Sequence, residues 1–359
     1  MNRHRENLRR RDFLIRSGLA AAGGLLATGC NSPRNAGKSN SIAGESPVTA
    51  FIYDPIYNKH FAGRGHPESP LRLEAIMDLI EKTDFGGRLE IVRPRDAVDE
   101  EILHVHTEQY LQQVRRDISL GRNVLSMGDT NVSAASLDAA VKAAGGICLA
   151  VDKVVAGECK NAFCAVRPPG HHSGAERGSG FCVFNNVAIA ARRAQETHDL
   201  SRVLIVDWDV HHGNGTQETF YADPSVLFFS THQWPLYPGT GHPDETGRGK
   251  GIGTTINCPF RHGSGRDQIV KAFRDKLIPA ADEFKPDLVL ISAGFDSRIE
   301  DPLGGFTLTD DDFADLTQIM TDIAARHASG RLVSTLEGGY NPVGLAKAVC
   351  AHCGVLASV

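Results

Sequence analysis

The sequence lacks the features of a nucleic-acid-binding, disordered or fibrous chain. Its formal net charge of -5 is small for 359 residues, and acidic and basic residues are interspersed instead of gathered in blocks. This charge pattern gives no reason to expect nucleic acid as a partner. No repeat period is present, and the apolar content of 41% excludes disorder and a collagen-like repeat. What remains is a globular chain long enough for one large domain or two ordinary ones.

The chain also lacks a disulfide framework, since its eight cysteines follow no regular spacing. Four of them lie in apolar or tightly turning contexts, where cysteine usually behaves as a small buried residue: Cys148, Cys164, Cys182 and Cys258. Cys350 and Cys353 form a C-x-x-C pair, but without a second ligand pair this is a weak signal for zinc or redox chemistry. A disulfide between them is left open.

The first thirty residues differ in composition from the rest. They hold six arginines against two acidic residues, followed by an apolar run from Gly18 to Gly29. That run is well short of the roughly 20 residues that span a bilayer. A basic segment, a short apolar segment and small residues together indicate an export signal. Arg10-Arg11-Asp-Phe-Leu resembles a twin-arginine signal, which exports proteins that are already folded.

The end of this leader resembles a lipoprotein processing site. Cleavage in Leu26-Ala-Thr-Gly-Cys30 would leave Cys30 lipidated as the new N-terminus. We therefore expect residues 1–30 to be an export signal, 31–47 a polar tether and 48–359 the folded domain, placed in the periplasm or lipid-anchored at the cell envelope. Membrane contact is expected only through this lipid. A basic tail on a cytoplasmic enzyme is the alternative.

From Val48 onward, apolar strand-like runs alternate with amphipathic helical patterns, which predicts a single α/β domain. Several runs are apolar on both faces, as in a parallel sheet covered on both sides. The predicted strands are 49–53, 161–166, 202–207, 226–230, 287–292 and 331–336. The predicted helices are 71–83, 134–156, 187–197, 268–284, 310–327 and 342–351.

The loops after the strands carry most of the reactive side chains. Four strand ends are followed by Arg167-Pro-Pro-Gly-His-His172, Asp207-Trp-Asp-Val-His-His-Gly-Asn-Gly215, Ala293-Gly-Phe-Asp296 and Glu337-Gly-Gly-Tyr340. In open parallel sheets the ligand site lies beyond the carboxyl ends of the strands. We therefore expect these His, Asp and Tyr residues to share one rim.

Alternating Asp207, Asp209 and His211 place their side chains on one side of an extended backbone, so two of them can bind one cation. Asp296 arrives from another strand end. An Asp/His/Asp set leaves a fourth coordination position open, which is the pattern of a catalytic zinc site. Zinc would polarise a carbonyl and lower the pKa of its water.

The tandem histidines His171 and His172 each need an orienting acceptor, and Asp207 and Asn214 are suitably placed to supply one. Two glycines before Tyr340 let the backbone turn sharply and present the phenol as a hydrogen-bond donor. A donor opposite a metal would hold an oxyanion.

These motifs, together with Tyr237-Pro-Gly-Thr-Gly241, resemble the zinc-dependent histone deacetylase family. The resemblance extends from His66-Pro-Glu68 through His104-Val-His106 to Tyr340. Within the family, Asn214 and the segment 301–305 are similar to class II deacetylases and their bacterial amidohydrolase relatives. The resemblance implies the arginase/deacetylase fold, a single parallel sheet of eight strands flanked by helices.

The resemblance also implies roles for individual residues. Asp209, His211 and Asp296 would hold zinc, His172 would be the general base, and Tyr340 would stabilise the oxyanion. His171 would be an electrostatic partner supported by Asp207, with Asn214 behind His172. Substrate contacts would come from Gly180, Phe181 and Tyr237 in an acyl-lysine tunnel and from Asp129 and Leu303 at its rim. Potassium would occupy one site formed by Asp207, Asp209, His211, Ser230 and Thr231, and another near Phe220, Asp223 and Val226.

The expected function is zinc-dependent removal of acetyl or other acyl groups from lysine side chains or related amines. Acetylpolyamine hydrolysis is one alternative, and a non-catalytic acyl-peptide binding protein is another, although intact Tyr340 and both histidines argue against the latter. An arginase-type ureohydrolase would need two metals and a second Asp-rich motif. The sequence leaves the physiological substrate and the oligomeric state open.

Overall fold

The computed structural model describes residues 48–359 of the chain. The predicted export signal, the Cys30 lipidation site and the tether at 31–47 lie outside the described residues. Among those described, none of the helices combines the length and the hydropathy that a bilayer crossing requires.

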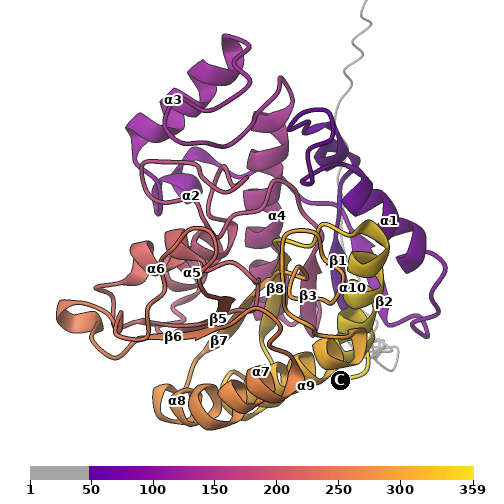
Figure 1. Ribbon diagram of the computed structural model, residues 1–359, viewed down its shortest axis with the longest axis vertical. Helices are drawn as coiled ribbons and strands as arrows, with labels where there is room; N and C mark the ends of the chain where they lie inside the picture. The colour runs from indigo at the N-terminus through magenta and orange to yellow at the C-terminus, as the bar shows by residue number, and fades with distance from the viewer. Residues whose placement is uncertain (1–47) are drawn as a thin grey trace, which may run out of the picture. The chain divides into compact units, whose positions relative to one another are not determined.

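The centre of the described domain is one sheet of eight strands with the order β2-β1-β3-β8-β7-β4-β5-β6 (Figure 1). Every pair of neighbouring strands is parallel. The strands are β1 Thr49–Ile52, β2 Leu89–Val92, β3 Asn161–Cys164, β4 Val203–Asp207, β5 Val226–Gln233, β6 Thr255–Phe260, β7 Leu288–Ala293 and β8 Leu332–Leu336. The predicted single eight-stranded parallel sheet is confirmed.

The six strands predicted from apolar runs are the buried ones. β1, β3, β4, β5, β7 and β8 are buried along their whole length, which matches sequences that are apolar on both faces. The two strands that the runs did not reveal are the edge strands. β2 exposes Glu90 and Ile91, and β6 contains Pro259, a residue that sheets admit mainly at their edges.

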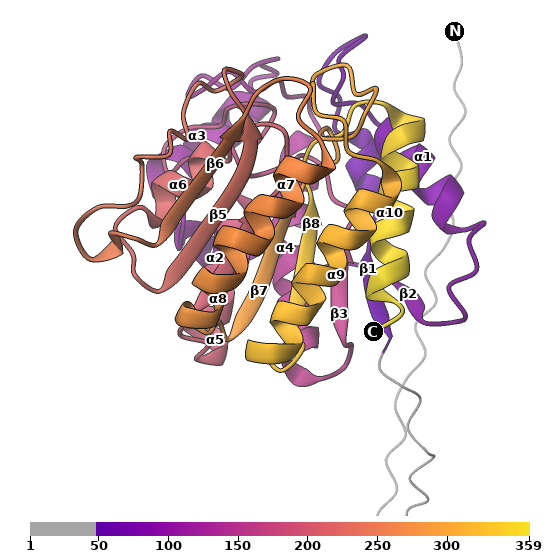
Figure 2. The ribbon, with the colours of Figure 1, turned by 60° about the horizontal axis from the view of Figure 1, so that its bottom comes forward.

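Helices cover both faces of the sheet. In Figure 2, α7, α8, α9 and α10 lie in front of the strands, whereas α4 lies behind them. The α-helices are α1 Leu71–Ile80, α2 Asp99–Leu103, α3 Glu108–Ser119, α4 Ser136–Ala156, α5 Asn186–His198, α6 Asn214–Phe220, α7 Arg266–Ala272, α8 Ile278–Phe284, α9 Asp310–His327 and α10 Pro342–Leu356. Short 3-10 helices occupy Pro55–Lys59 and Gly249–Gly251.

The helix boundaries correct several predictions. The first predicted helix ends at Ile80 instead of 83, and the last extends to Leu356. The predicted helix 268–284 is interrupted by a π-helical turn, Phe273–Leu277, just before Pro279 in the first turn of α8. Proline cannot donate the helical hydrogen bond, which gives a local reason for this irregularity. The helices α2, α3 and α6 were not predicted.

The C-x-x-C segment has a packing role in α10. Both Cys350 and Cys353 are free thiols, so the disulfide left open by the sequence is not formed. Between them, His352 is fully buried, with Nδ1 2.7 Å from Thr317 Oγ1 and Nε2 2.8 Å from Ser334 Oγ. The segment therefore fastens α10 to α9 and β8.

Candidate active site

The four reactive loops follow four strands that are neighbours in the sheet, in the order β3, β8, β7 and β4. Because all four strands are parallel, their carboxyl ends lie along the same edge. The fold therefore brings together segments that are more than 100 residues apart in the sequence.

Asp209, His211 and Asp296 form a compact group of potential metal ligands. One ligand-type atom from each lies within 4.8 Å of the others. His211 Nδ1 is 3.0 Å from Asp209 Oδ1 and 3.1 Å from Asp296 Oδ2. The third member of the alternating pattern, Asp207, turns away toward His171, because the chain leaves the extended conformation after β4.

Backbone amides hold the two carboxylates in place. Asp209 Oδ2 accepts a hydrogen bond from the Gly338 N–H at 2.8 Å, and Asp296 Oδ1 accepts one from the Val210 N–H at 2.8 Å. Position 338 must be glycine, since a Cβ there would lie 2.1 Å from Asp296 Oδ2. The glycine thus allows β8 to approach the ligand group closely.

The charges in this group suit a divalent cation. Burial and the neighbouring Asp209 raise the pKa of Asp296 to about 7. Burial alone would lower the pKa of His211, but the two carboxylates outweigh it and raise the value to about 10. Two buried carboxylates this close together favour a positively charged partner, which a metal ion would supply. Two carboxylates and one imidazole fit zinc and leave room for one further ligand.

His171 and His172 lie side by side, with ring centroids 4.0 Å apart. His171 Nδ1 is 2.9 Å from Asp207 Oδ2, and His172 Nδ1 is 2.8 Å from Asn214 Oδ1. Burial lowers the pKa of His172 well below its ordinary value, and the neighbouring His171 adds to this effect. For His171, burial is outweighed by Asp207 and Asp209, which raise its pKa well above the usual range. These shifts favour the neutral imidazole at His172 and the protonated imidazole at His171.

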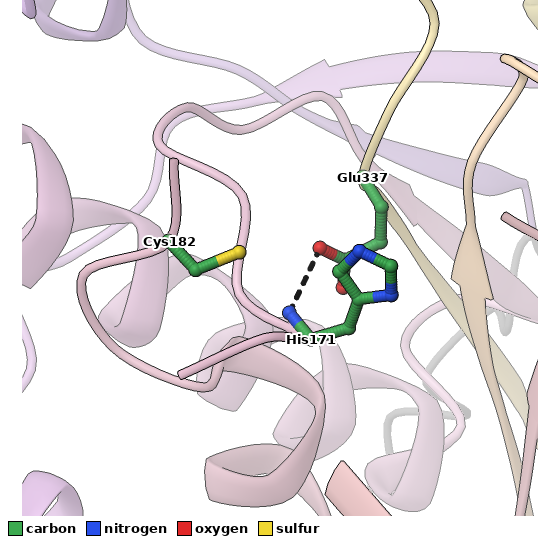
Figure 3. Close-up of side chains that lie close together, drawn as sticks. All are labelled: His171, Cys182 and Glu337. Carbon is green, nitrogen blue, oxygen red and sulfur yellow. Dashed lines mark hydrogen bonds between the residues drawn. The ribbon is translucent and has the colours of Figure 1, made fainter. Parts of the chain in front are cut away.

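A second cluster of ligand-type atoms joins His171, Cys182 and Glu337, again within 4.8 Å (Figure 3). Its groups are already engaged. The Glu337 carboxylate accepts hydrogen bonds from Gly170 N at 2.7 Å, His171 N at 3.1 Å and Ser292 Oγ at 3.0 Å. Burial raises the pKa of the Cys182 thiol well above its usual value, so the thiol stays protonated. This cluster is better described as a packed hydrogen-bond centre than as an ion site.

Tyr340 presents a protonated phenol beside these groups. Its side chain is almost fully buried, and burial raises the pKa of the phenol well above 10. The Arg72 guanidinium lies 5.0 Å from the centre of the ring, and the Phe181 ring meets it edge-on at 5.9 Å. The phenol is therefore available as a hydrogen-bond donor at all ordinary pH values.

Phe181 and Tyr237 flank the site from two sides. The Phe181 ring contacts Tyr340, whereas the Tyr237 ring lies 5.0 Å from His172 and 41% of Tyr237 is exposed. Both Gly180 and Phe181 have left-handed backbone angles, with φ of 56° and 69°. A Cβ at Gly180 would lie 2.3 Å from His172 Cδ2. The exposed Asp129 accepts a hydrogen bond from the Gly180 N–H at 2.9 Å.

The remaining predicted residues are Leu303, assigned to the rim, and the residues assigned to potassium. Leu303 is half-buried and follows Asp301 in the loop after β7. Of the residues assigned to potassium, Ser230 is the strand partner of Asp207, and Thr231 follows it. Phe220 and Val226 are buried. The Asp223 carboxylate pairs with Arg192 at 2.8 Å, so its side chain is already engaged with a cation.

Sequence reasoning missed a buried ionic network beneath the site. Glu68 Oε1 accepts a hydrogen bond from Arg72 at 3.1 Å, and Oε2 accepts one from Arg167 at 2.6 Å. Arg72 also donates to the Gly339 carbonyl at 2.6 Å and to the Glu337 carbonyl. Glu68, Arg167 and Glu337 all lie in motifs that the sequence shows, but their contacts cannot be read from it.

Comparisons with known proteins agree with this geometry. The family model described as histone deacetylase domain matches residues 66–356. A probable deacetylase of Archaeoglobus fulgidus is 40% identical over 83% of this chain and 82% of its own length. The polyamine deacetylase HDAC10 of Homo sapiens is 42% identical over 79% of this chain and 43% of its own length.

A bacterial relative and a solved structure extend the match. The histone deacetylase-like amidohydrolase of Pseudomonas aeruginosa is 36% identical over 82% of both chains. The crystal structure of the HDA15 HD domain is similar with a TM-score of 0.82 and 38% identity, covering 87% of this chain and 90% of that one. The chain therefore belongs to the histone deacetylase domain family and is a hydrolytic deacetylase.

Proposed function

We propose that the chain removes acetyl or related acyl groups from lysine side chains at a zinc site formed by Asp209, His211 and Asp296. The observation that carries this proposal is the convergence of these three residues with a neutral histidine and a protonated phenol at the same sheet edge. Zinc is the metal on which the family generally depends. Bound there, it would polarise the acyl carbonyl and make the attacking water more acidic.

The two histidines have different tasks in this mechanism. The Nδ1–H of His172 donates a hydrogen bond to Asn214 Oδ1, which leaves the lone pair on Nε2 free. There it accepts a proton as water adds to the acyl carbon, and it returns that proton to the leaving amine as the C–N bond breaks. The products are a carboxylic acid and a free amine. His171, protonated and paired with Asp207, supplies a fixed positive charge beside this transfer.

Tyr340 donates a hydrogen bond to the oxygen that becomes negative when water adds. Phe181 and Tyr237 would flank the methylene groups of the acylated side chain, and Asp129 and Leu303 would contact the substrate at the rim. We also propose that potassium binds at Asp207, Asp209, His211, Ser230 and Thr231 and near Phe220, Asp223 and Val226. At the second site it would use backbone carbonyls, because Arg192 engages the Asp223 carboxylate.

Turnover and metal content test this assignment together. The purified chain should contain one zinc per molecule and release the fluorophore from a fluorogenic acetyl-lysine peptide. Replacing Tyr340 with Phe should retain zinc but lower kcat by about a hundredfold, the usual scale for one oxyanion donor. Zinc binding without turnover in the unmodified chain would instead favour a binding protein.

Acetylpolyamines are the second candidate substrates, favoured by the similarity to a human polyamine deacetylase. They carry the same acetylated amine but a cationic tail instead of a peptide. A direct comparison of kcat/KM for acetylspermidine, acetylspermine and an acetyl-lysine peptide distinguishes the two substrate classes.

We also propose that the enzyme is exported and acts in the periplasm or at the cell envelope. The support is the order of the basic, apolar and small residues up to Cys30. Replacing Arg10 and Arg11 with Lys should keep the protein in the cytoplasm, because a guanidinium pair is not interchangeable with two ammonium groups. Replacing Cys30 with Ala should release the exported protein from membranes. Unchanged membrane association would contradict lipidation.

A further inference from the structure

Glu337 is a buried carboxylate for which the proposed reaction has no direct use. It lies at the end of β8, and its side chain is fully inaccessible to solvent. Its carboxylate does not belong to the Asp209, His211 and Asp296 group. Burying an ionisable side chain is costly unless its oxygens are well paired. The hydrogen bonds that this buried carboxylate makes should therefore explain its presence.

The two oxygens of Glu337 connect three strand ends. Oε2 accepts the backbone N–H groups of Gly170 and His171, at 2.7 and 3.1 Å, in the loop after β3. Oε1 accepts the hydroxyl of Ser292 at 3.0 Å, in β7. Figure 3 shows the hydrogen bond between one carboxylate oxygen of Glu337 and the backbone nitrogen of His171. These hydrogen bonds hold the backbone of Gly170 and His171 in place, at the start of the His171–His172 segment.

The backbone around Glu337 reaches the remaining parts of the site. The Gly338 N–H donates to Asp209 Oδ2 at 2.8 Å, and Arg72 donates to the Glu337 carbonyl. Tyr340 follows three residues later, after a Gly339 with φ of 117°. One short segment thus connects the base-bearing loop, a proposed metal ligand and the oxyanion donor. A shift of the Glu337 side chain would change the distances among all three.

We propose that Glu337 is a positioning residue, whose carboxylate sets the placement of His171 and His172 relative to the metal ligands and Tyr340. This role rests on the proposed hydrolysis at that site. Glu337 touches neither substrate nor metal in this role. The length of the Glu337 side chain is the property that matters, because it brings an acceptor oxygen to the Gly170 and His171 amides.

Two substitutions separate the effect of side-chain length from the effect of the carboxyl group. Glu337→Gln keeps an acceptor oxygen at the same distance, and its amide group can donate to the Ser292 hydroxyl. Glu337→Asp keeps the carboxyl group but is one methylene shorter. We expect kcat to fall less than about threefold in the Gln variant and on the order of a hundredfold in the Asp variant, as for a misplacement near 1 Å. KM and zinc content should change little in either.

The matched control is Glu283→Gln, an exposed glutamate on α8, which should behave as the unmodified enzyme. A second readout is independent of turnover, namely the imidazole 15N resonances of His171 and His172 in the zinc-loaded full chain. The chemical shifts of these resonances should change in the Asp variant and remain as in the unmodified enzyme in the Gln variant. If the unmodified chain has no deacylase activity, the proposed function fails, whereas the resonances still test the placement.

The proposal is overturned if the Gln variant loses as much kcat as the Asp variant, if the Asp variant is unaffected, or if the resonances stay fixed in both. If the Asp variant does not fold, Ser292→Ala replaces it, since this removes the hydroxyl that orients Oε1. It should shift the same resonances and lower kcat severalfold. An unchanged spectrum and kcat in that variant would also overturn the assignment.

Discussion

The Asp301 carboxylate accepts the backbone N–H of Tyr340 at 2.6 Å, although the two residues lie 39 positions apart in the sequence. The same oxygen also faces the Asn341 N–H at 3.3 Å, and the other oxygen accepts the Leu303 N–H at 2.9 Å. Asp301 therefore ties the turn that carries the oxyanion donor to the loop that carries the rim residue.

Replacing Asp301 with Ala should lower kcat while leaving zinc bound. The substitution leaves three backbone amides without this acceptor and frees the Tyr340 turn, so we expect a loss of tenfold to on the order of a hundredfold. Thermal unfolding and zinc content are measured alongside. Asp244→Ala, with a side chain that is 90% exposed, is the control. Unchanged kcat in the Asp301 variant would show that the turn carrying Tyr340 keeps its conformation without the Asp301 carboxylate.

Replacing Asp296 with Ala should abolish stoichiometric zinc binding. The change removes one of two carboxylates from the ligand group and leaves Asp209 and His211, which is too few protein ligands for a stable catalytic zinc site. Metal content after gel filtration, measured by atomic absorption, gives the answer. Asp244→Ala again provides the reference. A full complement of zinc in the Asp296 variant would mean that the ligands have been misassigned.

Replacing Asn214 with Asp should shift the pH dependence of kcat/KM. Burial, together with the charge of His171, holds the pKa of His172 low, and its acceptor Asn214 is neutral. A carboxylate in that place stabilises the imidazolium and raises the pKa of His172. Since the base must be deprotonated to act, activity is lost on the acidic side as pH falls through this pKa. The acidic limb should therefore move to higher pH by about one unit or more.

That experiment also distinguishes the roles of the two histidines. If His171 were the base, a charge at position 214 would leave the acidic limb nearly unmoved, because the acceptor of His171 is Asp207. A limb that stays in place would therefore contradict the assignment of His172.

The sequence revealed the parts of this site that are local in the chain. Asp209 and His211 are two residues apart, and the motifs at the four strand ends carry their own glycines, so a short window contains both the reactive group and the turn that presents it. The contacts of Glu68 could not be found in this way, since its partner Arg167 is 99 residues distant. The same holds for Glu337, whose meaning depends on which strands become neighbours.

The edges of the fold escaped prediction for a related reason. Buried central strands are continuous apolar runs, which a sequence shows directly. The edge strand β2 is short and half-exposed, so its apolar signal is weak, and in β6 a proline argues against a strand. The prediction of eight strands rests on the family resemblance instead. The apolar runs alone predict only the six buried strands.

Leu303 should make the enzyme prefer acyl-lysine peptides over acetylpolyamines. It is half-buried at the rim loop, and its apolar side chain offers no partner to the distant ammonium of a polyamine. It can instead pack against the methylenes of an acyl-lysine side chain. We expect a higher kcat/KM for an acetyl-lysine peptide than for acetylspermidine or acetylspermine. Leu303→Glu should shift that order toward the polyamines, with Leu303→Gln as the uncharged control.

Long-range attraction works in the opposite direction, since the exposed Asp129 and a net charge of -5 favour cations. Added salt screens that attraction but not the contact with Leu303. A preference for acetylpolyamines in the unmodified enzyme that survives high salt would therefore show that Leu303 does not select the substrate.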